Sequence, residues 1–120
     1  MNNWVGIGRL GRAPEVRYNS DGFAVGHFSI AIDRPPRKDG NKETDWIPIV
    51  VFGKQAENAE KYLDKGLRVA VFGRLQVSSY ERDGQKRSRA EIVADRIEYL
   101  DRKEQAPEDS GWKEPDDFTF

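Results

Sequence analysis

The alternation of apolar and polar side chains along most of the chain is the feature that most restricts its fold. Five stretches alternate with a period of two, as β-strands do, and turn residues separate them. We expect these strands at residues 4–10 with a continuation at 15–18 after Pro14, then at 23–33, 45–52, 67–80 and 87–100. The polar segment between residues 34 and 44 is expected to be a loop, and Asp83-Gly84 a turn.

A single helical pattern, at residues 54–65, lies between the third and fourth strands, and Gly66 is expected to cap it. Its expected apolar face consists of Ala56, Ala59, Tyr62 and Leu63. Three strands, a helix and two strands is the order of the OB-fold, a partly open barrel that commonly binds oligonucleotides. The sequence therefore predicts an all-β, five-stranded OB-fold barrel, with an SH3-like barrel as the alternative.

The apolar positions of the last two strands predict where the core lies. In the fourth strand the expected core face comprises Leu67, Val69, Val71, Leu75 and Val77. In the fifth strand the apolar phase changes between Ala94 and Ile97, which indicates a β-bulge.

Composition and charge exclude several classes of protein. The 120 residues suffice for one domain and a tail, and the absence of cysteine removes disulfides and cysteine-based zinc sites and fits a reducing cytoplasm. We see neither an apolar run near 18 residues nor a signal peptide, so no membrane partner is expected. Residues 1–100 carry a net charge of +3 and residues 101–120 a net charge of −4. A basic body with an acidic tail favours a polyanion as the ligand of the body.

Two motifs that suggest other chemistry do not fit their context. Gly6 to Gly11 matches the dinucleotide pattern G-x-G-x-x-G, but Pro14 and the turn at Asn19 leave no room for the helix that this pattern needs, so we interpret the glycines as part of a bent strand. The single histidine, His27, has no cysteine partner and is expected to be a strand surface residue. Neither a metal nor another cofactor is expected.

The third strand carries large rings on its non-core side. Because Ile47, Ile49 and Val51 form its core face, the period of two places Trp46 and Phe52 opposite. Pro48 cannot donate to a ladder, so part of this strand is expected to be an edge or bulged. Tyr80 lies opposite the core face of the fourth strand.

Cations surround these rings. The candidate phosphate-binding residues are Arg34, Arg37, Lys38, Lys54, Arg74, Arg82, Lys86, Arg87 and Arg89. Rings on which bases stack, interleaved with cations that follow phosphates, are what sequence-tolerant binding of single strands needs. The sequence predicts a nucleic-acid-binding face made by Trp46, Phe52, Tyr80 and these cations.

Longer motifs resemble the bacterial single-stranded DNA-binding protein family. Residues 8–18, GRLGRAPEVRY, resemble its first-strand signature, and residues 45–57, DWIPIVVFGKQAE, its third strand and helix start. The tip, Asp116-Asp117-Phe118-Thr119-Phe120, is similar to the acidic tip of the family. The resemblance implies single-stranded DNA as ligand, stacking on Trp46, Phe52 and Tyr80, and a homotetramer. The family's fourth aromatic position falls at Pro35 or Pro36, which carry no ring, so the resemblance implies three stacking residues in this chain.

The tail completes the expected organisation. We expect an OB-fold domain at residues 1–100, a short flexible linker at 101–115 and a disordered acidic tip at 116–120 that binds replication and repair proteins. A flexible linker of about 15 residues gives a root-mean-square reach on the order of 20 Å. The short linker and the Phe118-Thr119 pair would suit a phage- or plasmid-borne member.

Other functions stay open at this point. An OB-fold RNA-binding or RNA-chaperone module would use the same rings, because stacking platforms accept both polymers. A primosome-type adaptor could use the same barrel, but such adaptors lack the acidic tip. An enzyme is disfavoured, because we find no clustered carboxylates, P-loop or nucleophile elbow.

Overall fold

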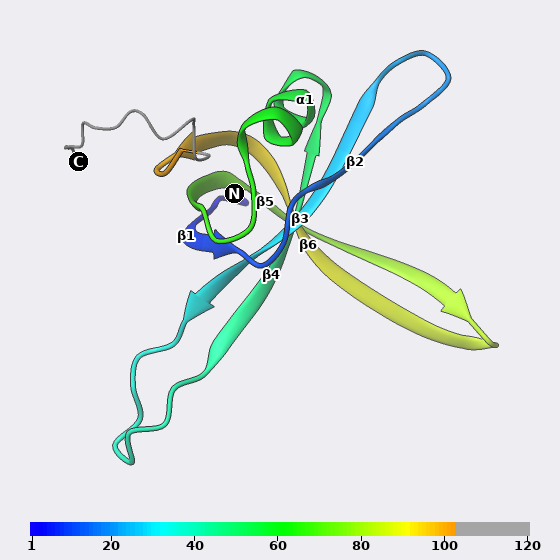
Figure 1. Ribbon diagram of the computed structural model, residues 1–120. Coiled ribbons are helices and arrows are strands. Elements are labelled where there is room, and N and C mark those ends of the chain that lie inside the picture. The colour runs from blue at the N-terminus through cyan, green and yellow to red at the C-terminus, as the bar shows by residue number, and fades with distance from the viewer. Residues whose placement is uncertain (103–120) are drawn as a thin grey trace, which may run out of the picture.

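The computed structural model describes residues 1–102, in which six strands and one helix make up a barrel (Figure 1). In chain order these elements are β1 (Trp4–Leu10), β2 (Glu15–Tyr18), β3 (Ala24–Asp33), β4 (Thr44–Phe52), α1 (Gly53–Tyr62), β5 (Arg68–Arg82) and β6 (Gln85–Tyr99). Every expected strand is confirmed to within a few residues. Of the linker expected at residues 101–115 the structure describes only residues 101 and 102, and the tip expected at 116–120 lies outside the described residues.

The sheet closes on itself because β1 has two partners. The strand order is β1-β5-β6-β4-β3-β2, and β1 also pairs with β3. Gly8 lies where β1 passes from β5 to β3, and a Cβ atom there would collide with the carbonyl oxygen of Ala31. The glycines of the G-x-G-x-x-G motif therefore serve a bent strand, as predicted. All neighbouring strands are antiparallel except β4 and β6, which pair in parallel at Ile49–Ile92 and Val50–Val93.

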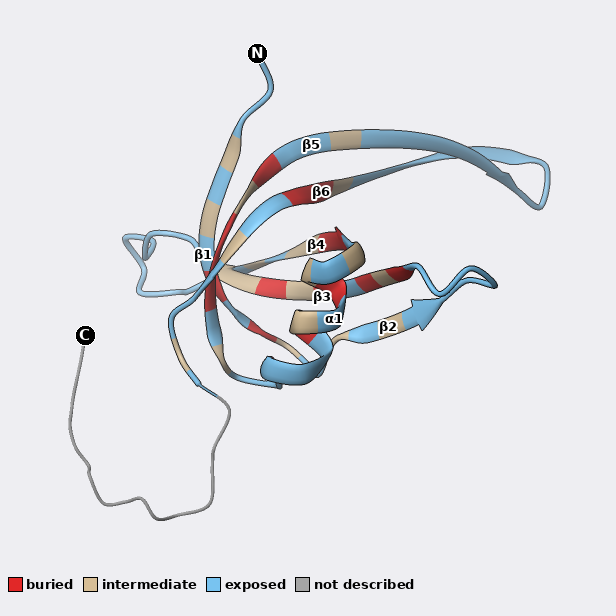
Figure 2. Cartoon of the chain, turned by 90° about the horizontal axis from the view of Figure 1, so that it is seen from above, coloured by how far each residue is buried: buried red, intermediate tan, exposed pale blue. Residues whose placement is uncertain are grey.

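Buried residues line the inside of the barrel, and α1 covers one part of it (Figure 2). Ala56 and Ala59 of α1 are fully buried, as expected, and so is Leu63. The expectation for Tyr62 is wrong, because its ring is exposed. The helix also ends at Tyr62, earlier than expected, because Leu63 is extended and directs its side chain into the core. Gly66, with φ of 85°, instead shapes the turn in which its N–H donates to the Leu10 carbonyl at 2.8 Å.

The predicted bulge lies in β6. Phe72 pairs with Arg96, whereas Gly73 pairs with Ala94, so Asp95 is the extra residue. Ile92 and Ala94 of β6 still belong to the core, so β5 and β6 leave the barrel as a long hairpin only beyond the pair of Leu75 and Ile92 (Figure 1). Leu75 and Val77 of β5 are exposed, so the core face expected for this strand ends at Val71.

Asp101 fixes the chain where it leaves β6. Its carboxylate accepts hydrogen bonds from the backbone N–H of Arg68 at 2.9 Å and from the Arg68 guanidinium at 3.1 and 3.2 Å. Arg9 of β1 lies 3.7 Å from the same carboxylate. These hydrogen bonds from Arg68 hold the pKa of Asp101 below its usual value. The end of the described chain is thereby tied to β5 and β1.

Candidate nucleic-acid interface

Trp46 and Phe52 stand on the outer face of β4, as the alternation predicts. Their side chains are 57% and 43% exposed, whereas Ile49 and Val51 between them are fully buried. Trp46 pairs with Ala31 and Phe52 with Val25 of β3. Because directly opposite residues of an antiparallel pair share a face, the outer faces of β3 and β4 form one surface between the two rings.

Pro48 is compatible with β4 because its missing N–H faces an open side. The backbone N–H of Arg34 donates to the carbonyl of Glu43 at 2.9 Å, which makes these two residues a hydrogen-bonded pair of the β3–β4 ladder. From there, pairs without and pairs with ladder hydrogen bonds alternate along the two strands. Pro48, opposite Ser29, then occupies a position without ladder hydrogen bonds. The pairing of β4 with β6 begins only at Ile49. The predicted open edge is therefore confirmed at this residue.

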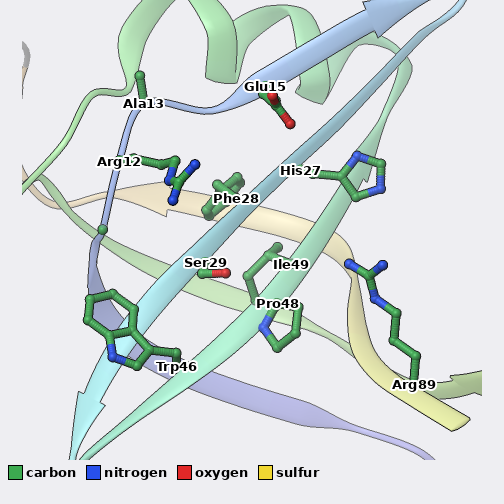
Figure 3. Close-up of a pocket in the computed structure, with 11 residues that line it drawn as sticks. Arg12, Ala13, Glu15, His27, Phe28, Ser29, Trp46, Pro48, Ile49 and Arg89 are labelled. Carbon is green, nitrogen blue, oxygen red and sulfur yellow. The ribbon is translucent and has the colours of Figure 1, made fainter. Parts of the chain in front are cut away.

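A pocket of about 450 Å³ lies on this surface beside Trp46. Figure 3 shows the guanidinium groups of Arg12 and Arg89 on opposite sides of the pocket, with the His27 ring and the Glu15 carboxylate along its rim. The remaining lining residues are Gly11, Ala13, Phe28, Ser29, Trp46, Pro48 and Ile49. The pocket thus combines one large exposed ring, that of Trp46, with cationic groups from two separate segments.

Arg12 and His27 were not among the residues that the sequence predicted for this face. Arg12 lies in the bend between β1 and β2, where no periodicity assigns a direction to its side chain. His27 is exposed on β3, as expected, but it also lines the pocket. Among residues 1–102 there is no group of three or more histidine, cysteine, aspartate or glutamate side chains that could hold a metal ion.

The Trp46 ring also packs against the end of β1. A Cβ atom on Gly11 would lie 2.5 Å from the ring, so only glycine admits the indole at this distance. One side of the ring is therefore supported by the backbone at Gly11, while more than half of the side chain stays exposed. This support fixes the orientation of the ring at the edge of the pocket.

The β5–β6 hairpin carries Tyr80 and several of the predicted cations. Tyr80 is exposed and lies opposite Arg87 in the ladder. Within the described part of the chain Arg82, Lys86 and Arg87 form no ion pair, so their charge is available to a ligand. Arg89, at the base of the hairpin, lies 3.4 Å from Glu91, and Arg74 donates to the Gln76 side chain at 3.0 Å.

The cations of the β3–β4 loop are largely engaged by carboxylates. Arg34 donates to Asp45 at 3.0 Å and to Glu43 at 2.7 Å, and Arg37 lies 3.0 Å from Glu43. The hydrogen bonds from Arg34 lower the pKa of Asp45. These pairs reduce the positive charge that the loop can offer to phosphates.

Two further predicted cations lie outside these clusters. Lys38 makes no ion pair with any described residue, and Lys54 lies 4.0 Å from Glu57 at the start of α1. The structure thus brings Trp46 and Arg89 together at the pocket, with Phe52 further along β4. Tyr80 lies on the β5–β6 hairpin and the loop cations lie between β3 and β4. The hairpin and the loop leave the barrel in different directions (Figure 1).

Known proteins are similar to this chain in sequence and in fold. The pattern of the Single-strand binding protein family matches residues 1–100. The chain belongs to this family. Single-stranded DNA-binding protein 3 of Clostridium acetobutylicum is 46% identical over 103 residues, which cover 84% of this chain and 72% of the relative. Single-stranded DNA-binding protein 2 of Staphylococcus aureus is 44% identical over 105 residues, covering 86% and 74%.

A solved structure supports the same assignment. The Plasmodium falciparum SSB in complex with ssDNA superposes with a TM-score of 0.77 at 30% identity, covering 84% of this chain and 96% of that one. The predicted OB-fold and the family resemblance are therefore confirmed. As a member of the single-strand binding family the chain binds single-stranded DNA, and the family is non-enzymatic. No helix in residues 1–102 is long and apolar enough to span a membrane.

Proposed function

We propose that single-stranded DNA crosses the outer face of β3 and β4, with bases stacked on Trp46 and Phe52 and, on the hairpin, on Tyr80. The observation that carries this proposal is the pair of half-exposed rings on the outer face of β4, of which Trp46 borders a pocket lined by Arg12 and Arg89. Aromatic faces accept every base, and cations beside them neutralise phosphates without reading sequence. Coating of exposed strands during replication, recombination and repair follows from this mode of binding.

The cations are expected to contribute unequally, which a salt titration tests. If Arg87 contacts a phosphate, Arg87→Gln should reduce the slope of log K against log salt by about 0.7, the value for one phosphate on a single strand. Arg34→Gln should change the slope less, because Asp45 and Glu43 already neutralise Arg34. The measurement is the affinity for a dT oligomer at several salt concentrations.

Lys65→Gln, which removes an exposed cation after α1, is the control for the loss of net charge. Equal slopes for Arg87→Gln, Lys65→Gln and the wild-type protein would contradict phosphate contact by the hairpin.

We also propose the domain organisation and the role of the tail that the sequence suggests. Residues 1–100 would bind DNA, residues 101–115 would serve as a linker, and Asp116 to Phe120 would recruit replication and repair proteins. An acidic segment with a terminal ring suits an apolar pocket with a basic rim. A cytoplasmic location is part of the same proposal, since the ligand and the partners are found there.

Association of several copies, as a tetramer, is proposed from the outer side of β1. Val5 and Ile7 are 61% and 59% exposed there, and they lie opposite Phe72 and Ala70 of β5. Among the described residues, β1 pairs with β3 only at its end, through Arg9 and Leu10, so the earlier part of this strand has an open edge. An apolar face beside an unpaired edge favours contact with a second copy.

Ile7→Asp tests this interface. A carboxylate in an apolar contact is strongly unfavourable, so the variant should have a smaller mass than the wild-type protein in light scattering after size exclusion. Val77→Asp is the matched control, because Val77 is 60% exposed but lies on the hairpin. A wild-type protein that is monomeric at every concentration, or an Ile7→Asp variant of unchanged mass, would contradict the proposed interface.

A further inference from the structure

A second exposed ring lies against Phe52. The ring of Phe23 is 47% exposed, and its centroid lies 6.3 Å from that of Phe52, with an angle of 20° between the ring planes. The two rings therefore stack on each other in nearly parallel planes, and a little under half of each residue stays exposed to solvent. Together they form one aromatic cluster at the end of β4.

Phe23 also lies on the side of β3 that faces the proposed DNA path. It continues the alternation of Val25 and His27 toward the β2–β3 turn, and Val25 pairs with Phe52. The order along this surface is then Trp46, the pocket, Phe52 and Phe23. A strand that leaves Phe52 in the direction away from Trp46 would meet Phe23 next.

The turn before β3 holds Phe23 in place. The side-chain oxygen of Asn19 accepts the N–H groups of Asp21 and Phe23 at 2.9 Å each, and Asn19 donates its own N–H to the Phe23 carbonyl at 3.0 Å. Gly22 has φ of 83°, a conformation that favours glycine. A ring on a backbone fixed in this way loses little freedom when a ligand binds.

The backbone beside Phe52 leaves space for this ring. A Cβ atom on Gly53 would lie 3.4 Å from the Phe23 ring, so Phe23 packs over the residue at which β4 becomes α1. Tyr18 donates to the Glu60 carboxylate at 2.8 Å and ties the same hairpin to the helix. The Phe23 ring thus rests on Gly53, and the hydrogen bonds of Asn19 and Tyr18 hold the hairpin that carries it.

We propose that Phe23 is an additional stacking platform for a nucleobase, one step beyond Phe52. This inference rests on the proposed path over Trp46 and Phe52. The separation of the two rings is one that a single extended nucleotide can span. Because Pro35 and Pro36 provide no ring in the β3–β4 loop, Phe23 supplies an aromatic surface at the opposite end of the path.

Phe23→Ala tests the platform directly. Loss of one half-exposed stacking surface should weaken binding of long dT oligomers about five- to tenfold, the lower part of the range for base–aromatic stacking. Phe23→Leu, which keeps an apolar side chain but lacks the ring, should lose most of the same affinity. Tyr62→Ala is the matched control, since Tyr62 is 45% exposed on α1, and its affinity should equal that of the wild type.

Two further measurements separate stacking from mere support of Phe52. In a Phe52→Ala background, Phe23→Ala should still weaken binding. Photo-crosslinking of dT oligomers that contain 5-iododeoxyuridine should place an adduct on Phe23 in the wild-type protein. Wild-type affinity of a folded Phe23→Ala variant would overturn the platform, and so would an effect that vanishes in the Phe52→Ala background without an adduct on Phe23. Unchanged affinity of Trp46→Ala would instead contradict the path itself, so the two failures are distinct.

Discussion

Trp46→Ala is expected to weaken binding of dT oligomers by about 1–3 kcal/mol per site, the range for a base stacked on an aromatic ring. The same substitution should remove most of the fluorescence quenching that the oligomers cause. The indole is 57% exposed and rests on Gly11, so a base can cover its free face without displacing other side chains. Fluorescence titration gives the quenching, and anisotropy of a labelled oligomer gives the affinity independently.

Trp4→Phe is the control for the fluorescence change. Trp4 lies over Gly6 and packs against the core, so DNA should not reach it, and its replacement should leave the quenching intact. Thermal melting must show that both variants fold. If a folded Trp46→Ala variant binds as tightly as the wild type, the ring only covers Gly11 and the proposed path is wrong.

Removal of Asp116 to Phe120 is expected to abolish recruitment of partner proteins. It should also strengthen binding of single-stranded DNA modestly, because the acids compete with phosphates for the basic face, and most at low salt, where screening is weakest. The measurements are binding to purified helicases, nucleases and polymerase subunits, and dT affinity at two salt concentrations. The barrel should melt at the same temperature, since its strands and its helix all lie within residues 4–99.

Phe120→Ala separates the two roles of the tip. The ring carries no charge, so its loss should reduce partner binding strongly and leave dT affinity almost unchanged. Replacement of Asp116 and Asp117 by asparagine should affect both measurements. Full recruitment by the truncated protein would show that the tip has no part in partner binding.

The fold could be predicted because its signals are local. A change of apolar phase between Ala94 and Ile97 marked the bulge, and Trp46 and Phe52 were placed correctly by the period of two. The same periodicity failed at Val77, because a strand pattern does not show where a hairpin leaves the barrel. The end of α1 was also mispredicted, because burial of Leu63 outweighed the capping signal at Gly66.

The site was harder to predict from the sequence than the fold, because its contacts join residues that are far apart in the chain. The pairing of Arg34 with Asp45 spans the whole β3–β4 loop, and nothing in the pattern shows that the two groups meet. Arg12 points into the pocket from a bend, where no period applies. Phe23 had one usable signal, since it is the first residue of the strand expected at 23–33 and the alternation places it on the same side as Val25 and His27.

The short parallel contact between β4 and β6 would make closure of the barrel sensitive to the bound ligand. In the described part of the chain these strands pair only at Ile49–Ile92 and Val50–Val93, so this seam has few hydrogen bonds to oppose local opening. The pocket spans the seam, with Trp46 and Pro48 on one side and Arg89 on the other. A single strand of DNA that is held by residues on both sides of this seam would bind only the closed barrel. Its binding free energy would then add to the free energy of closure. Bound DNA would in this way stabilise the closed barrel of the protein that coats it.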